Sequence, residues 1–329
     1  MSNSIDPLYQ KMSELRNISD LNIYPFCFDD RNVINATCFL SPKGKNYFVG
    51  IPTGTILRLY DLLNEFLYDE KIRDIPLLKE IMADDLFVSL YVNALHYIVK
   101  HEYMHIIYGH CLYANQRGMY YMEESCHPNQ DSSINQMKNQ AMELIADVFA
   151  VKDSISQILP LCNGNITLLK QNVLIYYLSI LFVFSIFYID EHIDWEDPGI
   201  IHSLIQESHP CISTRFFYIA DAVDSELLFQ FRQISEETVL KMVEEIDKVI
   251  DLVYQISAQY NKYFKMELVE PAYSKAGLIY YKNIMNACKE VVGENNDFAF
   301  YKTEGFKDIQ KVNKLEQEIN ELRRQISPD

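Results

Sequence analysis

The chain has 329 residues, of which 49% are hydrophobic and 23% charged, enough apolar material for a folded protein with a substantial core. Its formal net charge of −17 argues against nonspecific nucleic-acid binding, because most of such a surface would repel a polyanion. We interpret the acidity as a solubilising surface, with a basic or neutral partner as the alternative. The chain opens without a basic and apolar leader, and its seven cysteines form no CxxC pair, so we expect reduced thiols and a cytoplasmic protein.

The N-terminal fifth of the chain has β character. Apolar residues alternate with more polar ones from Ile34 to Leu40, a turn-like SPKGKN segment follows, and the run YFVGI occupies 47–51. This pattern predicts a β-hairpin. Its second strand either offers an edge to which an extended substrate adds or is an ordinary edge strand.

Helical periodicity replaces the β pattern after Pro52 and Gly54, where apolar residues recur every three or four positions. A long helix is expected over 83–110, and further helices at about 136–158, 165–190, 209–224, 228–265 and 270–290. The predicted fold class is mainly α with a small N-terminal β-hairpin or sheet, an α+β protein. We expect the chemistry in a domain over 1–227, followed by a helical C-terminal region over 228–329.

Two internal segments stand out from this helical pattern. The segment 113–135 is rich in turn-forming residues and has no clear period, so it predicts a loop and a candidate lid. The run VLIYYLSILFVFSIFYI at 173–189 is apolar on all sides but only 17 residues long, at the lower limit for crossing a bilayer. We favour a buried core helix and no membrane, with a membrane span as the alternative.

The C-terminal segment 304–327 carries apolar residues at coiled-coil spacing, namely Val312, Leu315, Ile319, Leu322 and Ile326. Two to three heptads are fewer than a coiled coil normally needs. We therefore expect a surface helix docked on the body of the protein. Association with a protein partner or with a second copy is the alternative.

The chemical signal of the chain is HEYMH, an HExxH motif from His101 to His105 inside the predicted helix 83–110. Because a helix has about 3.6 residues per turn, His101 and His105 lie one turn apart on one face, where both imidazoles reach a single metal ion. Glu102 lies about 100° round the helix, placed to act as a general base on a metal-bound water. Zinc accepts such ligands tetrahedrally and leaves one position for water, so Zn²⁺ is the predicted cofactor.

A catalytic zinc ion needs a third protein ligand, and the segment AMELIADVFA offers Glu143, with Asp147 one turn later. The neighbours of both carboxylates are apolar, so at least one carboxylate is expected to be buried, and a buried carboxylate needs a partner. We predict that Glu143 binds the metal and that Asp147 accepts a hydrogen bond from a ligand histidine. A solvated acidic helix face is the alternative.

His110 is the rival third ligand, since HEYMHIIYGH resembles the longer zincin motif. The register differs, because that motif needs glycine and histidine where this chain has Tyr108 and Cys111. We therefore expect His110 to flank the end of the helix.

A third pattern, HPCISTR, runs from His209 to Arg215 and begins a predicted helix at Pro210. His209 is placed to lean toward the metal site. Arg215, nearly two turns on, is able to pair with a carboxylate or with a substrate carbonyl. Taken alone, this pattern is also what a helix start with a surface arginine gives.

The order HExxH, ExxxD and HPxxxxR, with a hydrophobic helix between the last two, resembles gluzincin-like peptidases related to HtpX and the CAAX prenyl proteases. It is most similar to the soluble Lit family of phage-exclusion peptidases, whose HExxHxxxGH form is matched from His101 to His110. The resemblance covers about residues 30 to 225 and implies a zincin-like helical core. It also implies zinc bound by His101, His105 and Glu143, Glu102 as base, and support of the transition state by Asp147, His209 and Arg215.

The predicted function is a zinc metalloendopeptidase that hydrolyses a peptide bond of a protein substrate, in phage defence if the resemblance holds. Lit-like peptidases are expected to cut elongation factor Tu, so a translation factor is the substrate by analogy only. Two other functions stay open. One is a membrane-associated peptidase of the HtpX kind, and the other is a partner-binding regulator in which the zinc site is structural or gated.

Overall fold

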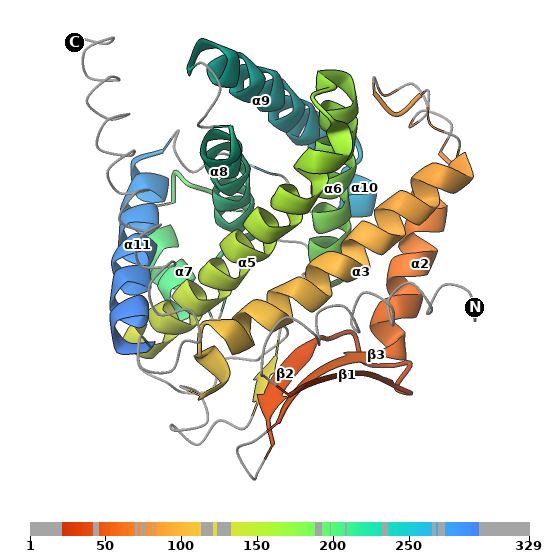
Figure 1. Cartoon of the computed structure of the whole chain (residues 1–329). Helices are drawn as coiled ribbons and strands as arrows, with labels where there is room; N and C mark the ends of the chain where they lie inside the picture. Colours follow the sequence, from red (N-terminus) through yellow and green to blue (C-terminus); the bar gives the residue numbers. More distant parts are fainter. Residues whose placement is uncertain are drawn as a thin grey trace, which may run out of the picture.

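The computed structural model describes residues 22–41, 46–69, 72, 75, 77–79, 81, 83–112, 121–123, 133–187, 193–197, 199–207, 209–231, 236–264, 268 and 274–295. Across these residues the protein is mainly α-helical with one small sheet, formed largely by the N-terminal part of the chain (Figure 1). The predicted fold class is confirmed. The C-terminal segment 304–327, with its coiled-coil spacing, lies outside the described residues.

The sheet has four strands in the order β1-β3-β2-β4, which are Ile23–Phe28, Tyr47–Pro52, Thr37–Leu40 and Tyr121–Glu123. Strands β2 and β3 pair antiparallel and are the predicted hairpin. Strand β1 pairs parallel with the other side of β3, so the interpretation of 47–51 as an edge strand, with or without a substrate, is wrong. The edges of the sheet are β1 and β4, and β4 lies within the segment predicted as a loop.

Alternation along the strands gives the sheet two different faces. On β2 and β3, Cys38, Leu40, Tyr47, Val49 and Ile51 are buried and belong to the main hydrophobic core. The opposite face carries aromatic rings that stack across strands, with the rings of Phe39 and Phe48 5.1 Å apart. The sheet therefore presents its aliphatic face to the helices.

Most of the predicted helices are present, and their observed bounds are α2 Thr53–Leu67, α3 Ala83–Ile107, α5 Ser133–Cys162, α6 Ile166–Phe187, α7 Ile200–Gln206, α8 Ile212–Gln230, α9 Glu236–Gln259, α10 Asn261–Phe264 and α11 Lys275–Asn295. The predicted helix 228–265 is divided into the end of α8, then α9 and α10. The short helix α7 was not predicted. Helix α3 passes over the sheet and packs against both α5 and α6 (Figure 1).

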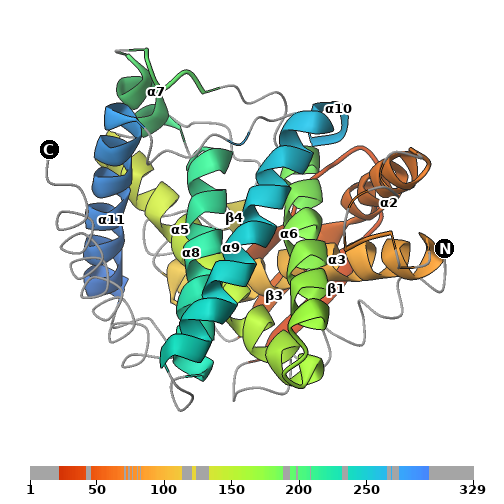
Figure 2. The same cartoon turned by 90° about the horizontal axis from the view of Figure 1, so that it is seen from above.

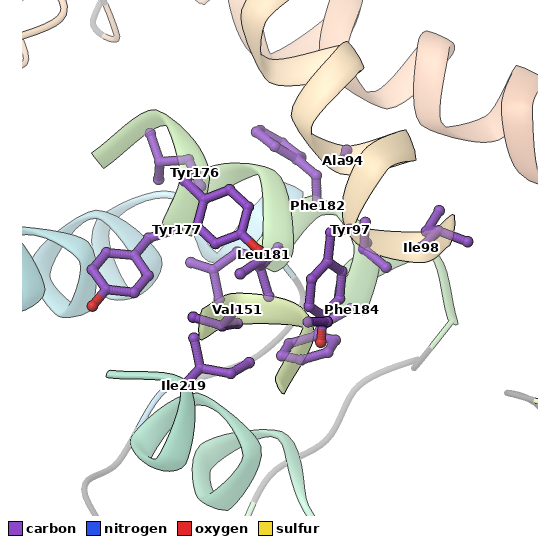
Figure 3. Close-up of a cluster of buried hydrophobic side chains, with 14 of the residues drawn as sticks. Ala94, Tyr97, Ile98, Val151, Tyr176, Tyr177, Leu181, Phe182, Phe184 and Ile219 are labelled. Atoms are coloured by element: carbon purple, nitrogen blue, oxygen red, sulfur yellow. The ribbon is translucent and has the colours of Figure 1, made fainter. Parts of the chain in front are cut away.

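Helix α6 lies in the middle of the helical layer and packs against α3, α9, α2, α5 and α10. Its side chains join those of neighbouring helices in the cluster of Figure 3, where Tyr176, Leu181 and Phe182 come from α6 and Tyr97 from α3. Among the described helices, α6 alone is long and apolar enough to cross a membrane, and 67% of its most apolar stretch is buried inside the protein. The packing agrees with the predicted buried helix and makes α6 the centre of the core.

The helices after residue 228 pack on this same body. Figure 2 shows α9 beside α6 and α8, and α11 beside α5. Apolar residues of α9 belong to the core cluster of α3 and α6, while those of α11 form a second cluster with α5 and α8. The division into 1–227 and 228–329 stays a prediction, although α9 and α11 share cores with helices of the first region.

Candidate metal centre

The two histidines of the HExxH motif meet Glu143 where α3 and α5 pack together. The Nε2 atoms of His101 and His105 are 3.0 Å apart, and Glu143 places Oε2 3.1 Å from His101 Nε2 and Oε1 3.5 Å from His105 Nε2. All three side chains are buried. The three predicted ligands thus form one buried group that can hold a metal ion.

The spacing of these atoms fits a tetrahedral metal ion. Metal bonds to imidazole nitrogen of about 2.0–2.1 Å place tetrahedral ligand atoms about 3.3–3.4 Å apart. The two Nε2 atoms are 3.0 Å apart, and His101 and His105 face different oxygens of Glu143 at 3.1 and 3.5 Å, all close to that value. Two neutral imidazoles and a carboxylate also suit a first-row metal ion by their chemistry.

Asp147 lies behind His101, one turn after Glu143 on α5. Its Oδ1 is 2.9 Å from His101 Nδ1 and accepts a hydrogen bond from the Tyr97 hydroxyl at 2.6 Å. A proton held on Nδ1 by this carboxylate leaves the Nε2 lone pair of His101 directed at the metal position. The structure therefore places Asp147 beside His101, where the sequence predicted it, and its role as the partner of a metal ligand stays a prediction, whereas Tyr97 was not predicted.

Arg215, on α8, is a further partner of Asp147. Its Nε and Nη2 donate to the two oxygens of Asp147 at 2.7 and 2.8 Å, and its guanidinium lies 4.7 Å from the centre of the Phe184 ring. Burial raises the pKa of Asp147, but Arg215 and His101 outweigh it and hold that pKa at about 2. The sequence left a carboxylate or a substrate carbonyl as the partner of Arg215, and in the structure the partner is the Asp147 carboxylate. Because Arg215 is fully buried, it supports the site through Asp147.

His110 plays the corresponding part behind His105. Gly109, with a φ of 76°, ends the α3 helix and turns His110 back, so that the Nδ1 atoms of His110 and His105 are 2.9 Å apart. Burial and the neighbouring His105 hold the pKa of His110 well below its usual value, so His110 is neutral and one of the two Nδ1 atoms donates to the other. His110 is therefore outside the ligand group and orients His105.

His209 reaches the site from the loop between α7 and α8. Its Nε2 is 3.8 Å from Glu143 Oε2, so the structure places it beside the predicted ligand group. Burial raises the pKa of Glu143, but His105 and His209 outweigh it, and the resulting pKa lies well below the usual value. Glu143 is therefore an anion, as a metal ligand must be.

The loop that carries His209 is fixed by Gln140, one turn before Glu143 on α5. The Gln140 amide donates to the Leu204 and Glu207 carbonyls, both at 2.7 Å, and its oxygen accepts a hydrogen bond from the Tyr280 hydroxyl at 2.6 Å. Because Tyr280 belongs to α11, this contact ties the C-terminal region to the site. Sequence reasoning missed Gln140, whose only signal was its helical spacing from Glu143.

Glu102 is 2% exposed and lies on the side of α3 that faces the sheet. Burial, then Cys111 and then the Glu102 carboxylate raise the pKa of Cys38, a residue of β2. Glu102 is thus a buried carboxylate close to a thiol of the sheet. Its role as general base stays a prediction.

A scan against models of known protein families found no match to this chain, and searches of curated proteins and of solved structures found none either. The resemblance to Lit peptidases therefore stays a prediction based on the three motifs. Each motif contributes side chains to one buried site, by way of α3, α5 and the start of α8.

Proposed function

We propose that this protein is a zinc metalloendopeptidase of the cytoplasm. One observation carries the proposal: the Nε2 atoms of His101 and His105 lie 3.0 Å apart and each faces one oxygen of the buried Glu143 carboxylate, so the three side chains form a group that can hold a metal ion. Both histidines have a fixed partner on their other ring nitrogen, as ligand histidines of metal enzymes do. An HExxH sequence that occurs by chance would not be expected to have a polar partner beside each of its two histidines.

A bound zinc ion would supply an activated water molecule and polarise the substrate carbonyl. Glu102 would serve as the general base that accepts a proton from the attacking water and passes it to the leaving amine, because the residue after the first histidine of an HExxH helix is placed beside the ligands without being one of them. His209, beside the ligand group, would donate to the carbonyl oxygen as negative charge develops on it. Asp147 and Arg215 hold His101 in place throughout.

A protein substrate in extended form is the one that this architecture suits best. Strand β4 is an outer strand of the sheet and pairs with β2, on which Cys38 lies close to Glu102. A substrate strand added to β4 would extend this sheet, with β4 between the substrate and β2. A translation factor such as elongation factor Tu, cut during phage infection, is the substrate by analogy with Lit peptidases.

A structural zinc site in a partner-binding regulator is the second candidate, and one contact favours it. His209 Nε2 lies 3.8 Å from Glu143 Oε2, within reach of the metal position after a small movement. If His209 were a fourth ligand, protein atoms would close the site, as in structural zinc centres. The two functions then differ in what the loss of His209 does to metal binding.

Metal analysis of purified variants tests both candidates. We expect one zinc ion per chain in the wild type, in Glu102→Gln and in His209→Ala, and loss of zinc in His105→Ala and Glu143→Ala. Hydrolysis of a protein or peptide library, followed by mass spectrometry, should then be present in the wild type and absent in Glu102→Gln. Zinc lost from His209→Ala would favour the structural site, and zinc retained in Glu143→Ala would mean that another residue is the third ligand.

A further inference from the structure

Two thiols meet beside the candidate metal centre. Cys38 on β2 and Cys111 just after α3 are 73 residues apart in the chain, yet their Sγ atoms are 3.1 Å apart. A covalent disulfide has an S–S bond of about 2.05 Å, so the sulfurs need to approach by only about 1 Å. The fold therefore holds two distant cysteines close to bonding position.

Each cysteine of the pair is next to a residue of the candidate metal centre or of its support. Cys38 lies close to Glu102, the predicted general base, because the Glu102 carboxylate contributes to its raised pKa. Cys111 directly follows His110, whose ring faces the ligand His105 at 2.9 Å. A bond between the two sulfurs would link the wall beside Glu102 to the residue that orients a metal ligand.

We propose that Cys38 and Cys111 are an oxidation site, whose reversible disulfide lowers the activity of the adjacent metal centre. The regulatory part of this inference rests on the proposed function, whereas the disulfide itself does not. The oxidant is a peroxide. Cys111, which is 4% exposed while Cys38 is completely enclosed, is the sulfur that a peroxide reaches first.

The reaction balances with one molecule of hydrogen peroxide. The Cys111 sulfur, having given up its proton, attacks a peroxide oxygen, the O–O bond breaks, and the departing oxygen takes up the proton as water, which leaves a sulfenic acid. The Cys38 sulfur then attacks the Cys111 sulfur, the S–O bond breaks, and the hydroxyl leaves as a second water with the Cys38 proton. Both sulfurs are oxidised and both peroxide oxygens are reduced.

The groups around the two cysteines affect both the rate of disulfide formation and its effect on the metal centre. Burial and the nearby groups hold the pKa of Cys38 above its usual value, which opposes its thiolate and slows its attack on the oxidised Cys111 sulfur. Once formed, the bond removes a thiol hydrogen from beside Glu102 and draws Cys111 toward β2. His110 moves with its neighbour, so the orientation of His105 changes.

The test treats the full-length, zinc-loaded protein with hydrogen peroxide, blocks the remaining thiols with N-ethylmaleimide and maps the proteolytic peptides by mass spectrometry. We expect a peptide linked through Cys38 and Cys111, two hydrogen atoms lighter than its parts and separated by dithiothreitol. Cys111→Ser, or Cys111→Ala if the serine variant does not fold, abolishes it. Cys288→Ser, at an equally buried thiol of α11, retains it.

Zinc retention and peptide hydrolysis are measured on the same samples. A fall of about tenfold or more in hydrolysis or zinc affinity, restored by dithiothreitol, supports the regulatory role. A linked peptide with both properties unchanged overturns that role. Absence of the linked peptide, at peroxide doses that oxidise the half-buried Cys27, overturns the oxidation site itself. Because the linked peptide is detected by mass, a protein without peptidase activity would overturn the proposed function and leave the oxidation site standing.

Discussion

Arg215 binds Asp147 through two of its guanidinium nitrogens, Nε to Oδ2 at 2.7 Å and Nη2 to Oδ1 at 2.8 Å. Both side chains are completely buried, and the pair joins α8 to the helix that carries Glu143. The same carboxylate lies 2.9 Å from His101 Nδ1. Stability and metal binding therefore depend on one ion pair, and they can be separated by experiment.

We expect Arg215→Met to lower the free energy of unfolding by about 3–5 kcal/mol, because it leaves the Asp147 charge buried without its partner. In the double variant Arg215→Met/Asp147→Leu no charge is stranded, so much of that stability returns. The double variant still lacks the partner of His101 and should bind zinc about 10–100-fold more weakly. Urea unfolding of the zinc-free proteins and competition with a chelator measure the two effects. Equal free energies of unfolding in the single and double variants would contradict the explanation that the unpaired Asp147 charge causes the loss of stability.

His110 offers a second test of how the ligands are held. Replacing it by phenylalanine keeps an aromatic ring in the buried position but removes the nitrogen 2.9 Å from His105 Nδ1. Zinc affinity should fall about 10–100-fold while the protein stays folded. The exposed histidine of α7 is the control, and His202→Phe should bind zinc as the wild type does. Unchanged affinity in His110→Phe would mean that His105 is oriented by its packing alone.

The motifs of the site could be read from the sequence because each depends on a short helical spacing. His101, His105, Glu143 and Asp147 lie one turn apart in pairs, and a helix fixes their relative direction wherever it packs. Their partners could not be read this way. Tyr97 and Gln140 also lie one turn from a predicted ligand, but their hydrogen-bond partners come from other helices, and the sequence does not show how those helices pack.

The same limit explains the errors in the sheet. The hairpin of β2 and β3 is a local structure with its own turn, and it was predicted. Strand β1 contains Pro25 and lacks a clean alternation. It pairs directly with β3 although β2 separates them in the sequence, so nothing near 47–51 showed that β3 would be internal. Helix α7 has 7 residues, too few for a helical period to be recognised.

The Gln140 contacts predict a variant that separates loop position from metal binding. Gln140→Leu leaves the Leu204 and Glu207 carbonyls and the Tyr280 hydroxyl without this partner, at an expected cost of about 1–3 kcal/mol in the free energy of unfolding. Zinc content should stay at the wild-type level, while hydrolysis falls because His209 is no longer held. Gln157→Leu, at an exposed position of the same helix, serves as the control and should change neither property. Loss of zinc from Gln140→Leu would show that the Gln140 hydrogen bonds support the metal ligands as well as the loop that carries His209.

An acidic contact away from the metal centre makes stability depend on pH. Asp224 of α8 has its pKa raised to about 8, first by burial and then by the nearby Asp247 and Asp221. An unfolded chain holds the same carboxyl at about 3.9. Between about pH 4 and pH 8 the folded protein therefore binds the proton more tightly than the unfolded chain does, and stability falls as pH rises through this window.

Substituting Asp224 by asparagine removes this titration and keeps the shape of the side chain. Asp224→Asn should come close to the wild type near pH 4, where the carboxyl is protonated in the folded protein and about half protonated in the unfolded chain, and exceed it by about 1–3 kcal/mol in the free energy of unfolding near pH 9. Urea unfolding at these two pH values measures the difference. The control is Asp61→Asn on α2, which removes the same formal charge from an exposed position and should give a small, pH-independent change. An equal gain from both substitutions would assign the effect to net charge, because only a buried, shifted carboxyl confines the gain to high pH.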